Sequence, residues 1–278
     1  MNQPLVSIYI PTHNRKDRLR RAIESALNQT YKKIEVIVAD DASSDGTSEI
    51  MKDWCQKEPR LRYIRLEKPS GANIARNEAI RAAKGDYVTG LDDDDEMVPG
   101  RIEKLLKAYR PDLAFVSSRY FIQEEGKKSV KRLTFKRYIT KEDLLYTNIV
   151  GNQVFTSREK FLKAGLFDET LYAAQDVDMW VRLLDGCKYA KIVSEPLLVV
   201  NVSSSGTITS SARKRVGYWQ FYRKHKSSMS KSHRSYRLFG MLLETCPHPK
   251  RLWKLIPGDC SFYSFISFGK WIKYLKKK

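Results

Sequence analysis

Four consecutive aspartates at positions 92–95 are the densest group of chemically reactive side chains in this sequence of 278 residues. Carboxylates a few ångströms apart repel one another, and a bound divalent cation removes that penalty. An all-oxygen site favours Mg²⁺ or Mn²⁺, which usually keep positions open for substrate phosphates. A solvated acidic turn is the alternative interpretation. Because the run directly follows an apolar, strand-like segment (87–91), we favour a metal site.

The elements that would position this run alternate along the chain. Short apolar runs typical of buried strands are followed by segments with apolar residues at helical spacing. Such alternation predicts an α/β fold with a parallel sheet and helices on both faces. The predicted strands are 6–10, 34–39, 61–66, 87–91, 113–116 and 191–200, and the predicted helices are 19–27, 47–57, 72–83, 102–109 and 177–184.

Polar residues follow three of the predicted strands at the point where each strand ends. They are the segment 11–15, the pair Asp40 and Asp41, and the aspartates 92–95. Because ligands bind beyond the carboxyl ends of the strands in sheets of this kind, we expect all three groups to line one crevice. We interpret Asp40 as a structural acceptor within a turn rather than as a ligand of the substrate.

Several motifs at these strand ends resemble family 2 glycosyltransferases of the kind that build bacterial surface glycans. They are VSIYIPTHNR at 6–15, EVIVADDASSDGT at 35–47, the segment 71–79 followed by KGDY at 84–87, and LDDDD at 91–95. Their order and spacing match the family through about the first 110 residues, and a looser resemblance continues to about Ser211. The resemblance implies the GT-A fold, with a mostly parallel central sheet. It also implies a nucleoside diphosphate sugar donor and in-line attack with inversion at the anomeric carbon.

The resemblance also assigns roles to individual residues. Asp92 and Asp94 match the DxD pattern that holds a divalent ion, Mn²⁺ or Mg²⁺, on the donor diphosphate, and Asp94 is expected to contact the metal directly. Asp41 is expected to bind a uracil-type base. Arg76 is expected near the diphosphate or the base, with a solvated helix residue as the alternative. The predicted nucleotide-sugar-binding residues are Pro11, Thr12 and Arg15, near base and ribose, together with Asp41, Arg76 and Asp93.

The inverting reaction needs a carboxylate that takes the proton from the acceptor hydroxyl. In the family this is usually the Asp of a Glu-Asp pair before a helix that bears a Trp, and the stretch AQDVDMW at 174–180 matches it. Asp176 therefore takes the base position. The alternative is a helix cap, because acidic side chains are stabilised in the first turn of a helix. Gln175 replaces the usual Glu, and the departure leaves the assignment of the base in place.

Two further departures from the family bear on function. Processive members carry a Gln-x-x-Arg-Trp motif and membrane spans, whereas here Gln220 and Arg223 are followed by Lys224. We therefore expect a single addition rather than polymerisation. Some relatives place a His after the last core strand as a third metal contact, and Asn201 offers none.

The charge of the chain divides it into a near-neutral body and a basic end. The net charge is +19, and residues 201–278 contain 17 Lys and Arg against two acidic residues. We predict a glycosyltransferase domain over 1–211, with a nucleotide-sugar-binding half (1–110) and an acceptor-binding half (111–211). A basic, aromatic-rich helical region should cover 212–278. The stretch 126–152 looks irregular, and the four cysteines match no metal-binding spacing.

The last 18 residues, 261–278, combine aromatic and aliphatic side chains with lysines. A helix here would have an apolar side and a cationic side, which is typical of an interfacial membrane helix. A terminal helix packed on the body is the alternative, and no motif accompanies the charge to indicate nucleic-acid binding. No signal peptide is visible, and no stretch approaches the ~20 apolar residues of a spanning helix. We expect a cytoplasmic protein, peripheral at the inner face of the cell membrane.

These features together predict a metal-dependent, inverting hexosyl- or N-acetylhexosaminyltransferase. It would move one sugar from a UDP-sugar to a glycan acceptor, lipid-linked, in lipopolysaccharide, O-antigen or capsule biosynthesis. A sugar-1-phosphate nucleotidyltransferase is one alternative, but it would need a Gly-rich loop bearing Lys or Arg after the first strand. A catalytically weak sugar-nucleotide- or membrane-binding module of the same fold is another, and the intact Asp92, Asp94 and Asp176 argue against it.

Overall fold

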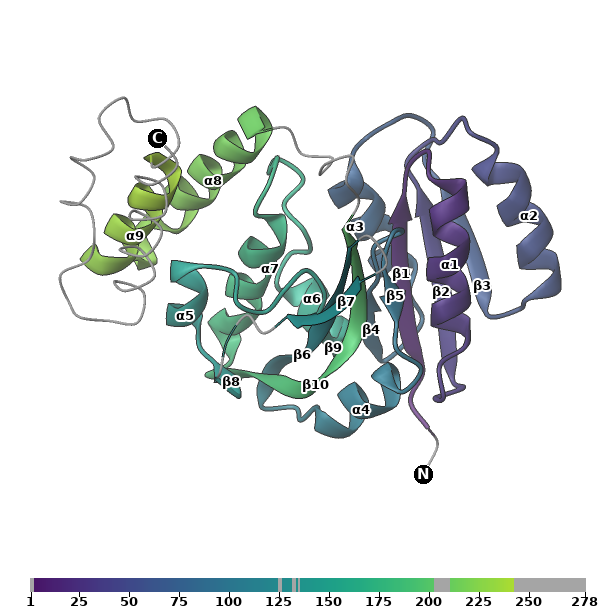
Figure 1. Ribbon diagram of the computed structural model, residues 1–278, viewed down its shortest axis with the longest axis horizontal. Helices are drawn as coiled ribbons and strands as arrows, with labels where there is room; N and C mark the ends of the chain where they lie inside the picture. The colour runs from purple at the N-terminus through teal and green to yellow at the C-terminus, as the bar shows by residue number, and fades with distance from the viewer. Residues whose placement is uncertain (1–2, 125–126, 132–133, 135, 203–210, 243–278) are drawn as a thin grey trace.

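The computed structural model describes residues 3–124, 127–131, 134, 136–202 and 211–242. Its centre is one sheet in the order β3-β2-β1-β4-β9-β6-β10-β5, with β7 paired to β6 and β8 paired to β10 (Figure 1). The strands are β1 (Val6–Thr12), β2 (Ile34–Asp40), β3 (Leu61–Arg65), β4 (Tyr87–Gly90), β5 (Glu96–Met97), β6 (Leu113–Glu124), β7 (Lys127–Lys131), β8 (Tyr138–Ile139), β9 (Phe155–Ser157) and β10 (Tyr189–Val202). The α-helices are α1 (Lys16–Leu27), α2 (Thr47–Lys57), α3 (Ala72–Ala82), α4 (Arg101–Ala108), α5 (Lys141–Tyr146), α6 (Arg158–Lys163), α7 (Gln175–Leu183), α8 (Ser211–His225) and α9 (Lys231–Leu242).

The predicted α/β fold class is confirmed, and the sheet is more mixed than the sequence suggests. Strands β3, β2, β1 and β4 are parallel, as are β6 and β10. The short strand β9 joins the two groups and runs antiparallel to both β4 and β6. Only two residues separate the end of β6 from the start of β7, and a connection that short permits only an antiparallel return.

The helices cover both faces of the sheet because successive side chains of the central strands point in opposite directions. In β1, Ile8 and Ile10 pack with Ile23 of α1 and Ile102 of α4 on one face. Tyr9 points to the other face, into a core shared with α3, α6 and α7. This two-sided burial makes β1 and β2 apolar throughout, and it fixes the ends of these strands at one edge of the sheet.

Element positions follow the sequence closely in the first half and less well beyond it. Helix α2 has the predicted bounds, 47–57, whereas the strand predicted at 113–116 continues to Glu124 because β7 and β10 both pair with it. The interpretation of 126–152 as irregular is wrong, since β7, β8 and α5 lie there. Helix α5 begins at a capping box formed by Thr140 and Asp143.

Helices α8 and α9 follow the predicted boundary at residue 211 and pack against the body. Phe221 of α8 is completely buried and Phe239 of α9 almost so. Arg237 of α9 donates two hydrogen bonds to the carbonyl oxygens of Leu144 and Leu145 in α5. Figure 1 shows both helices beyond α7, on the opposite side from α1 and α2. The division into domains stays a prediction, and the structure adds that the described part of the basic region shares the core of the body.

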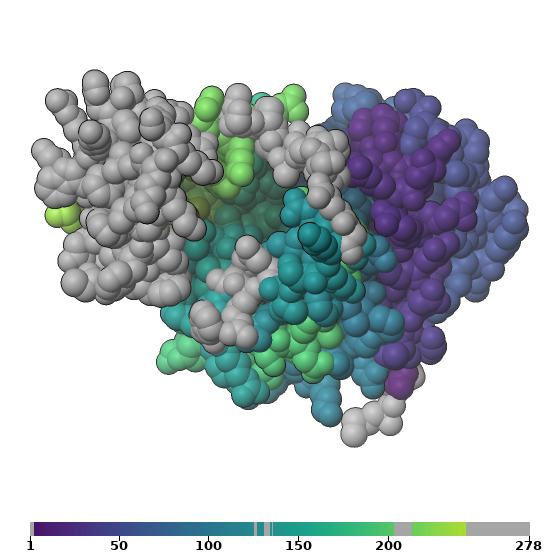
Figure 2. Space-filling model, in the orientation of Figure 1, coloured from purple at the N-terminus to yellow at the C-terminus, as the bar shows by residue number. Residues whose placement is uncertain are grey.

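Within the described ranges, no helix is both long enough and apolar enough to cross a membrane. The predicted interfacial helix at 261–278 lies outside these ranges. Cys55 and Cys187 are free thiols. On the face seen in Figure 2, the first strands and helices (purple to blue) adjoin the later elements (teal to green).

Candidate functional site

The three polar strand ends meet, as predicted, at the edge of the sheet where β2, β1 and β4 lie side by side. The backbone N–H of Asp41 donates to the carbonyl oxygen of Thr12 at 2.9 Å. The Thr12 hydroxyl in turn donates to Asp93 at 2.8 Å. Residues 81 positions apart in the chain are thus directly bonded. This edge of the sheet is the candidate active site.

The side chains of the aspartate run have different surroundings. Asp92 accepts hydrogen bonds at one oxygen from Arg76 (3.2 Å) and Gln153 (3.0 Å), and at the other from Asn152. Asp93 is buried and pairs with Arg15 at 2.9 Å. Both carboxylate oxygens of Asp92 and of Asp93 therefore accept hydrogen bonds from the protein before any ligand binds.

The last two aspartates of the run face opposite environments. Asp94 is partly exposed, and its Oδ2 accepts from Arg15 at 2.7 Å. Asp95 is buried and accepts from the backbone N–H of Asn201 at 3.1 Å. Burial, followed by the charges of Asp92 and Asp94, raises the pKa of Asp95 well above its usual value. The run therefore holds more negative charge than its surroundings offset, which is the condition that favours a bound cation.

A divalent ion fits this site only if the substrate completes its coordination. The part of the chain that the structure describes contains no group of three or more His, Cys, Asp or Glu side chains that could hold a metal by themselves. Of the two predicted ligands, Asp94 fits best, because its side chain is partly exposed and its contacts with the described residues all fall on one oxygen, Oδ2. Asp92 is already bonded to three donors. Mg²⁺ and Mn²⁺ commonly combine one or two carboxylates with phosphate oxygens and water, and these residues suit that arrangement.

Asp176 lies in the first turn of α7, near enough to Arg76 and Asp92 for their charges to act on it. The helix starts at Ala174, whose positive φ of 61° is uncommon for a residue with a Cβ atom, and no side chain caps this end. Asp176 is therefore not the cap. Burial raises the pKa of Asp176 to about 7, with Arg76 lowering it and Asp92 raising it. A carboxyl group with a pKa near neutrality is suited to accept a proton.

Arg76 links the donor side to Asp176. It is 8% exposed, so its interpretation as a solvated helix residue is wrong. Its guanidinium pairs with Asp92 and lies 5.6 Å from the centre of the Phe167 ring. The charges of Asp92 and Asp176 both act on it and raise its pKa, against the effect of burial. The charge of Arg76 thus acts on two carboxylates, those of Asp92 and Asp176.

The other predicted nucleotide-binding residues lie along the same edge. Pro11 is buried in β1, beside Ala39 of β2. Both carboxylate oxygens of Asp41 accept backbone N–H groups, from Ser70 at 2.6 Å and Gly71 at 2.8 Å, so Asp41 fixes the loop that leads into α3. Contact with a base stays a prediction for both residues.

The interpretation of Asp40 as a turn acceptor is confirmed. One of its oxygens accepts from the backbone and the hydroxyl of Ser43, and the other accepts from Tyr63. Asp40 is completely buried, and these bonds hold the end of β2 in place.

Three residues at the site were not predicted. Asn152 and Gln153 reach Asp92 from the connection before β9. The side chain of Asn201 donates to the backbone oxygen of Asp94 at 2.8 Å, so the position where some relatives have a metal-binding His here braces the aspartate run. None of these residues lies at the end of a predicted strand with a site motif, and the sequence offered no signal for the first two.

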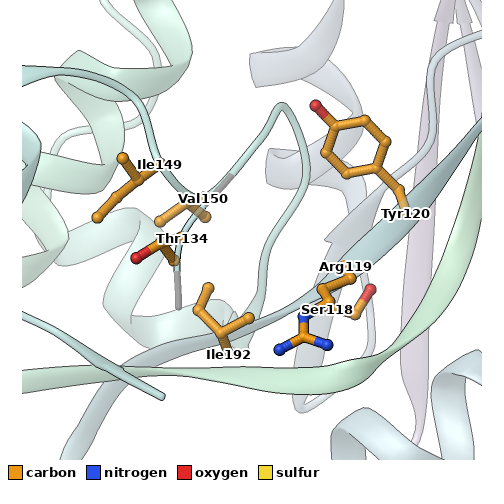
Figure 3. Close-up of a pocket in the computed structure, with 7 residues that line it drawn as sticks. All are labelled: Ser118, Arg119, Tyr120, Thr134, Ile149, Val150 and Ile192. Atoms are coloured by element: carbon orange, nitrogen blue, oxygen red, sulfur yellow. The ribbon is translucent and has the colours of Figure 1, made fainter. Parts of the chain in front are cut away.

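A small pocket lies within the segment 118–192, outside the predicted nucleotide-sugar-binding half. Figure 3 shows Ile149 and Val150 across from β6, with the Tyr120 ring at the other side of the opening. None of the predicted nucleotide-binding residues lines it, and Val150 belongs to the same connection as Asn152. Its lining residues are Ser118, Arg119, Tyr120, Thr134, Ile149, Val150 and Ile192.

Solved structures with the same fold define the class of the protein. TarS 1-349 of S. aureus, in complex with UDP-GlcNAc, superposes with a TM-score of 0.66 at 16% identity, over 97% of this chain and 81% of that one. The mannosyltransferase PcManGT from Pyrobaculum calidifontis, in complex with GDP-Man and Mn²⁺, gives 0.66 at 18% identity, over 99% and 83%. The fold is the GT-A fold of glycosyltransferases, as predicted.

The chain belongs to glycosyltransferase family 2, since the model described as "Glycosyl transferase family 2" matches residues 7–165. It is 38% identical over 245 residues to "Putative colanic acid biosynthesis glycosyl transferase WcaA" of Escherichia coli (strain K12), which covers 86% of this chain and 87% of the relative. It is 32% identical over 185 residues to "GalNAc(5)-diNAcBac-PP-undecaprenol beta-1,3-glucosyltransferase" of Campylobacter jejuni, covering 65% and 60%.

Proposed function

We propose that this glycosyltransferase moves one hexosyl or N-acetylhexosaminyl unit from a UDP-sugar to a hydroxyl of a lipid-linked glycan, with inversion, in the biosynthesis of a surface polysaccharide. The observation that carries the proposal is the position of Asp176. It lies close enough to the Arg76–Asp92 pair, at the edge where the three polar strand ends meet, for both charges to act on its carboxyl group, and it has no ion pair among the described residues.

On the donor side, the nucleotide would lie along 11–15 and Asp41, with its diphosphate toward Arg76 and Asp94. A divalent ion held by Asp94, with Asp92 and phosphate oxygens, would offset the charge of the leaving UDP. Arg15 now pairs with Asp94 at 2.7 Å and would turn toward the nucleotide when that carboxylate is engaged. A GT-A structure with GDP-Man and Mn²⁺ supports the need for a divalent ion.

On the acceptor side, Asp176 would take the proton of the attacking hydroxyl. Its pKa of about 7 gives it a substantial carboxylate fraction at neutral pH while it remains basic enough to accept a proton. Arg76 stabilises the carboxylate form before transfer. Asn152 and Gln153 hold Asp92 at a fixed position opposite.

The acceptor class is inferred from the relatives. Their names mention colanic acid and a diphospho-undecaprenol-linked glycan. A lipid-linked acceptor would bring the enzyme to the inner face of the cell membrane. The segment 261–278 is the proposed contact with anionic lipid, and it lies outside the described residues.

The proposal is tested by measuring UDP release from UDP-glucose, UDP-galactose, UDP-GlcNAc and UDP-GalNAc, each with and without Mn²⁺ and with a membrane extract as the acceptor source. One UDP-sugar should raise the melting temperature and release UDP in a Mn²⁺-dependent reaction. The product linkage, determined by NMR, should be β from an α-linked donor. If GDP-mannose stabilises the protein and none of the UDP-sugars does, the assignment of the donor is wrong.

A further inference from the structure

A second group of charged side chains lies where α7 and α8 meet, and none of its members belongs to the predicted nucleotide-binding residues. Its centre is Asp178, which is completely buried. One oxygen of Asp178 is 2.8 Å from Nε2 of His225 and 2.9 Å from Nζ of Lys224, both in α8. The other accepts from Nε of Arg182, one turn further along α7, at 2.9 Å. Both oxygens are therefore fully engaged.

The chemistry of this group indicates a role other than stability. Removing charges from water opposes their attraction, so a buried ion pair adds little net stability, while it restricts the partners to one arrangement. Here the arrangement fixes α8 against α7. The imidazole of His225 is also held against the Phe221 ring, with their centres 4.6 Å apart. Asp178 follows the proposed base, Asp176, by two positions on the same helix.

The contacts of α8 continue toward the donor site. Nζ of Lys224 also bonds to the carboxylate of Asp168 at 2.6 Å. The backbone oxygen of Asp168 accepts from Asn73 of α3 at 2.9 Å. The side-chain oxygen of Asn73 accepts from Arg76 at 3.4 Å, and Arg76 pairs with Asp92. Consecutive hydrogen bonds thus connect α8 with the aspartate run.

Helix α7 is tied to the same run by a second route. The indole N–H of Trp180, which is completely buried, donates to the backbone oxygen of Gly151 at 3.0 Å. The next two residues, Asn152 and Gln153, bond to Asp92. The orientation of α7 therefore determines the distance between the proposed base and Asp92.

We infer that Lys224 and His225 are positioning residues for sugar transfer, which hold Asp178 and thereby keep Asp176 directed at Arg76 and Asp92. The inference rests on the proposed function. It gives the described part of the basic region a role in the transfer step, in addition to any role in localisation. A base displaced by about 1 Å can lose roughly 100-fold in rate, while nucleotide binding on β1 and β2 is unaffected.

The test compares four variants of the full-length protein with the wild type. His225→Leu removes the hydrogen bond to Asp178, and His225→Gln keeps a side-chain N–H donor there. Lys224→Met removes the charge shared by Asp178 and Asp168, and Lys226→Met is the matched control at an exposed position. Turnover of the preferred UDP-sugar, the Kd for UDP with Mn²⁺ and the melting temperature are measured for each.

We expect His225→Leu and Lys224→Met to lower kcat about 10- to 100-fold with Kd for UDP within about twofold. His225→Gln should recover most of the loss, and Lys226→Met should match the wild type. Wild-type turnover in folded His225→Leu and Lys224→Met would overturn the inference. So would an equal loss of kcat and UDP affinity, or His225→Gln as inactive as His225→Leu, because these outcomes indicate a general structural role. Wild-type turnover in Asp176→Asn contradicts the proposed base instead, and a wild-type protein that releases UDP from none of the UDP-sugars contradicts the proposed function.

Discussion

The two acidic clusters of this protein balance their charge differently. At the donor edge, the ion pairs found among the described residues are those of Asp92 with Arg76, of Asp93 and Asp94 with Arg15, and of Asp94 with Arg18 at 3.8 Å. In the part of the chain that is described, Asp95 and Asp176 have no ion pair at all. Between α7 and α8, by contrast, Asp168 and Asp178 are matched by the cationic and donor groups of Arg182, Lys224 and His225.

This difference separates a site for a ligand from a site that orders the protein. An unmatched cluster keeps its carboxylates under repulsion, and a cation or a proton relieves it. A matched cluster has nothing left to bind, and removing one member leaves a buried charge without a partner. The pKa values express the contrast, since that of Asp176 is raised to about 7 and that of Asp168 is lowered to about 2.

The largest effect is expected at the unmatched carboxylate of Asp176. Asp176→Asn keeps the shape of the side chain but cannot take a proton, so transfer should fall by roughly 10²–10⁴-fold. The Kd for UDP with Mn²⁺, measured by calorimetry, should stay near the wild-type value because no donor-side contact is lost. If turnover stays near the wild-type level, another group acts as the base. The unmatched cluster would then not be distinguished from the matched one by a catalytic carboxylate.

Removing Asp178 itself, at the centre of the matched cluster, should lower stability as well. Asp178→Asn removes the counter-charge of the partly exposed Lys224 and Arg182 and replaces a completely buried carboxylate that accepts from both. Losing these charged hydrogen bonds should lower the free energy of unfolding by about 2–3 kcal/mol. The melting temperature should fall by roughly 10 °C for a chain of this size. Asp185→Asn is the control, because the exposed pair of Asp185 with Lys141 should contribute at most about 1 kcal/mol. Equal melting temperatures for the two variants would contradict the prediction.

Removing a carboxylate from the unmatched cluster should weaken binding of the metal and nucleotide. Asp94→Ala should raise the Kd for UDP in the presence of Mn²⁺ by about 10- to 100-fold or more, since even outer partners of a metal site contribute that much. Affinity without metal should change little. Asp112→Ala, which removes an exposed acid paired with Arg110, serves as the control. An unchanged Mn²⁺ dependence in Asp94→Ala would show that residues other than Asp94 bind the metal.

The unmatched cluster was largely predictable from the sequence and the matched one was not. Residues at 11–15, Asp41 and 92–95 follow strands directly, so a local pattern indicates where they meet. Arg182 lies one turn from Asp178 on the same helix, but the partners from α8 lie 46 and 47 residues away, on a helix whose own sequence gives no reason to place it against α7. Nothing local identifies them.

Other errors have the same physical origin. Asn152 reaches Asp92 across 60 residues of chain, through a connection positioned by Trp180. Helix α5 is a different case, because the capping box of Thr140 and Asp143 is a local signal for the start of a helix, within a stretch that is otherwise basic and weakly apolar. Tertiary contacts place Asn152 beside Asp92, whereas the capping box alone is enough to predict the start of α5.

The smallest effect is expected from a change of pH, because the carboxylates of the two clusters titrate in different pH ranges. Asp176 acts as a base only when deprotonated, so kcat should be constant well above pH 7 and fall about tenfold per unit below it, given its pKa of about 7. The pKa of Asp168 is depressed to about 2, so its stabilising contribution is complete above the unfolded value, about 3.9, and is lost only as pH falls toward 2. The fold should therefore remain intact from pH 8 to 5.5 while activity declines. Rate profiles with saturating UDP-sugar and Mn²⁺, recorded alongside circular dichroism, test both halves of this statement. A residual Asp176→Asn activity that is independent of pH would support the assignment. A wild-type rate profile that is flat down to pH 5.5 would show that Asp176 is ionised throughout this range. Bound substrate or metal would then neutralise the donor edge as fully as Lys224 and Arg182 neutralise the cluster between α7 and α8.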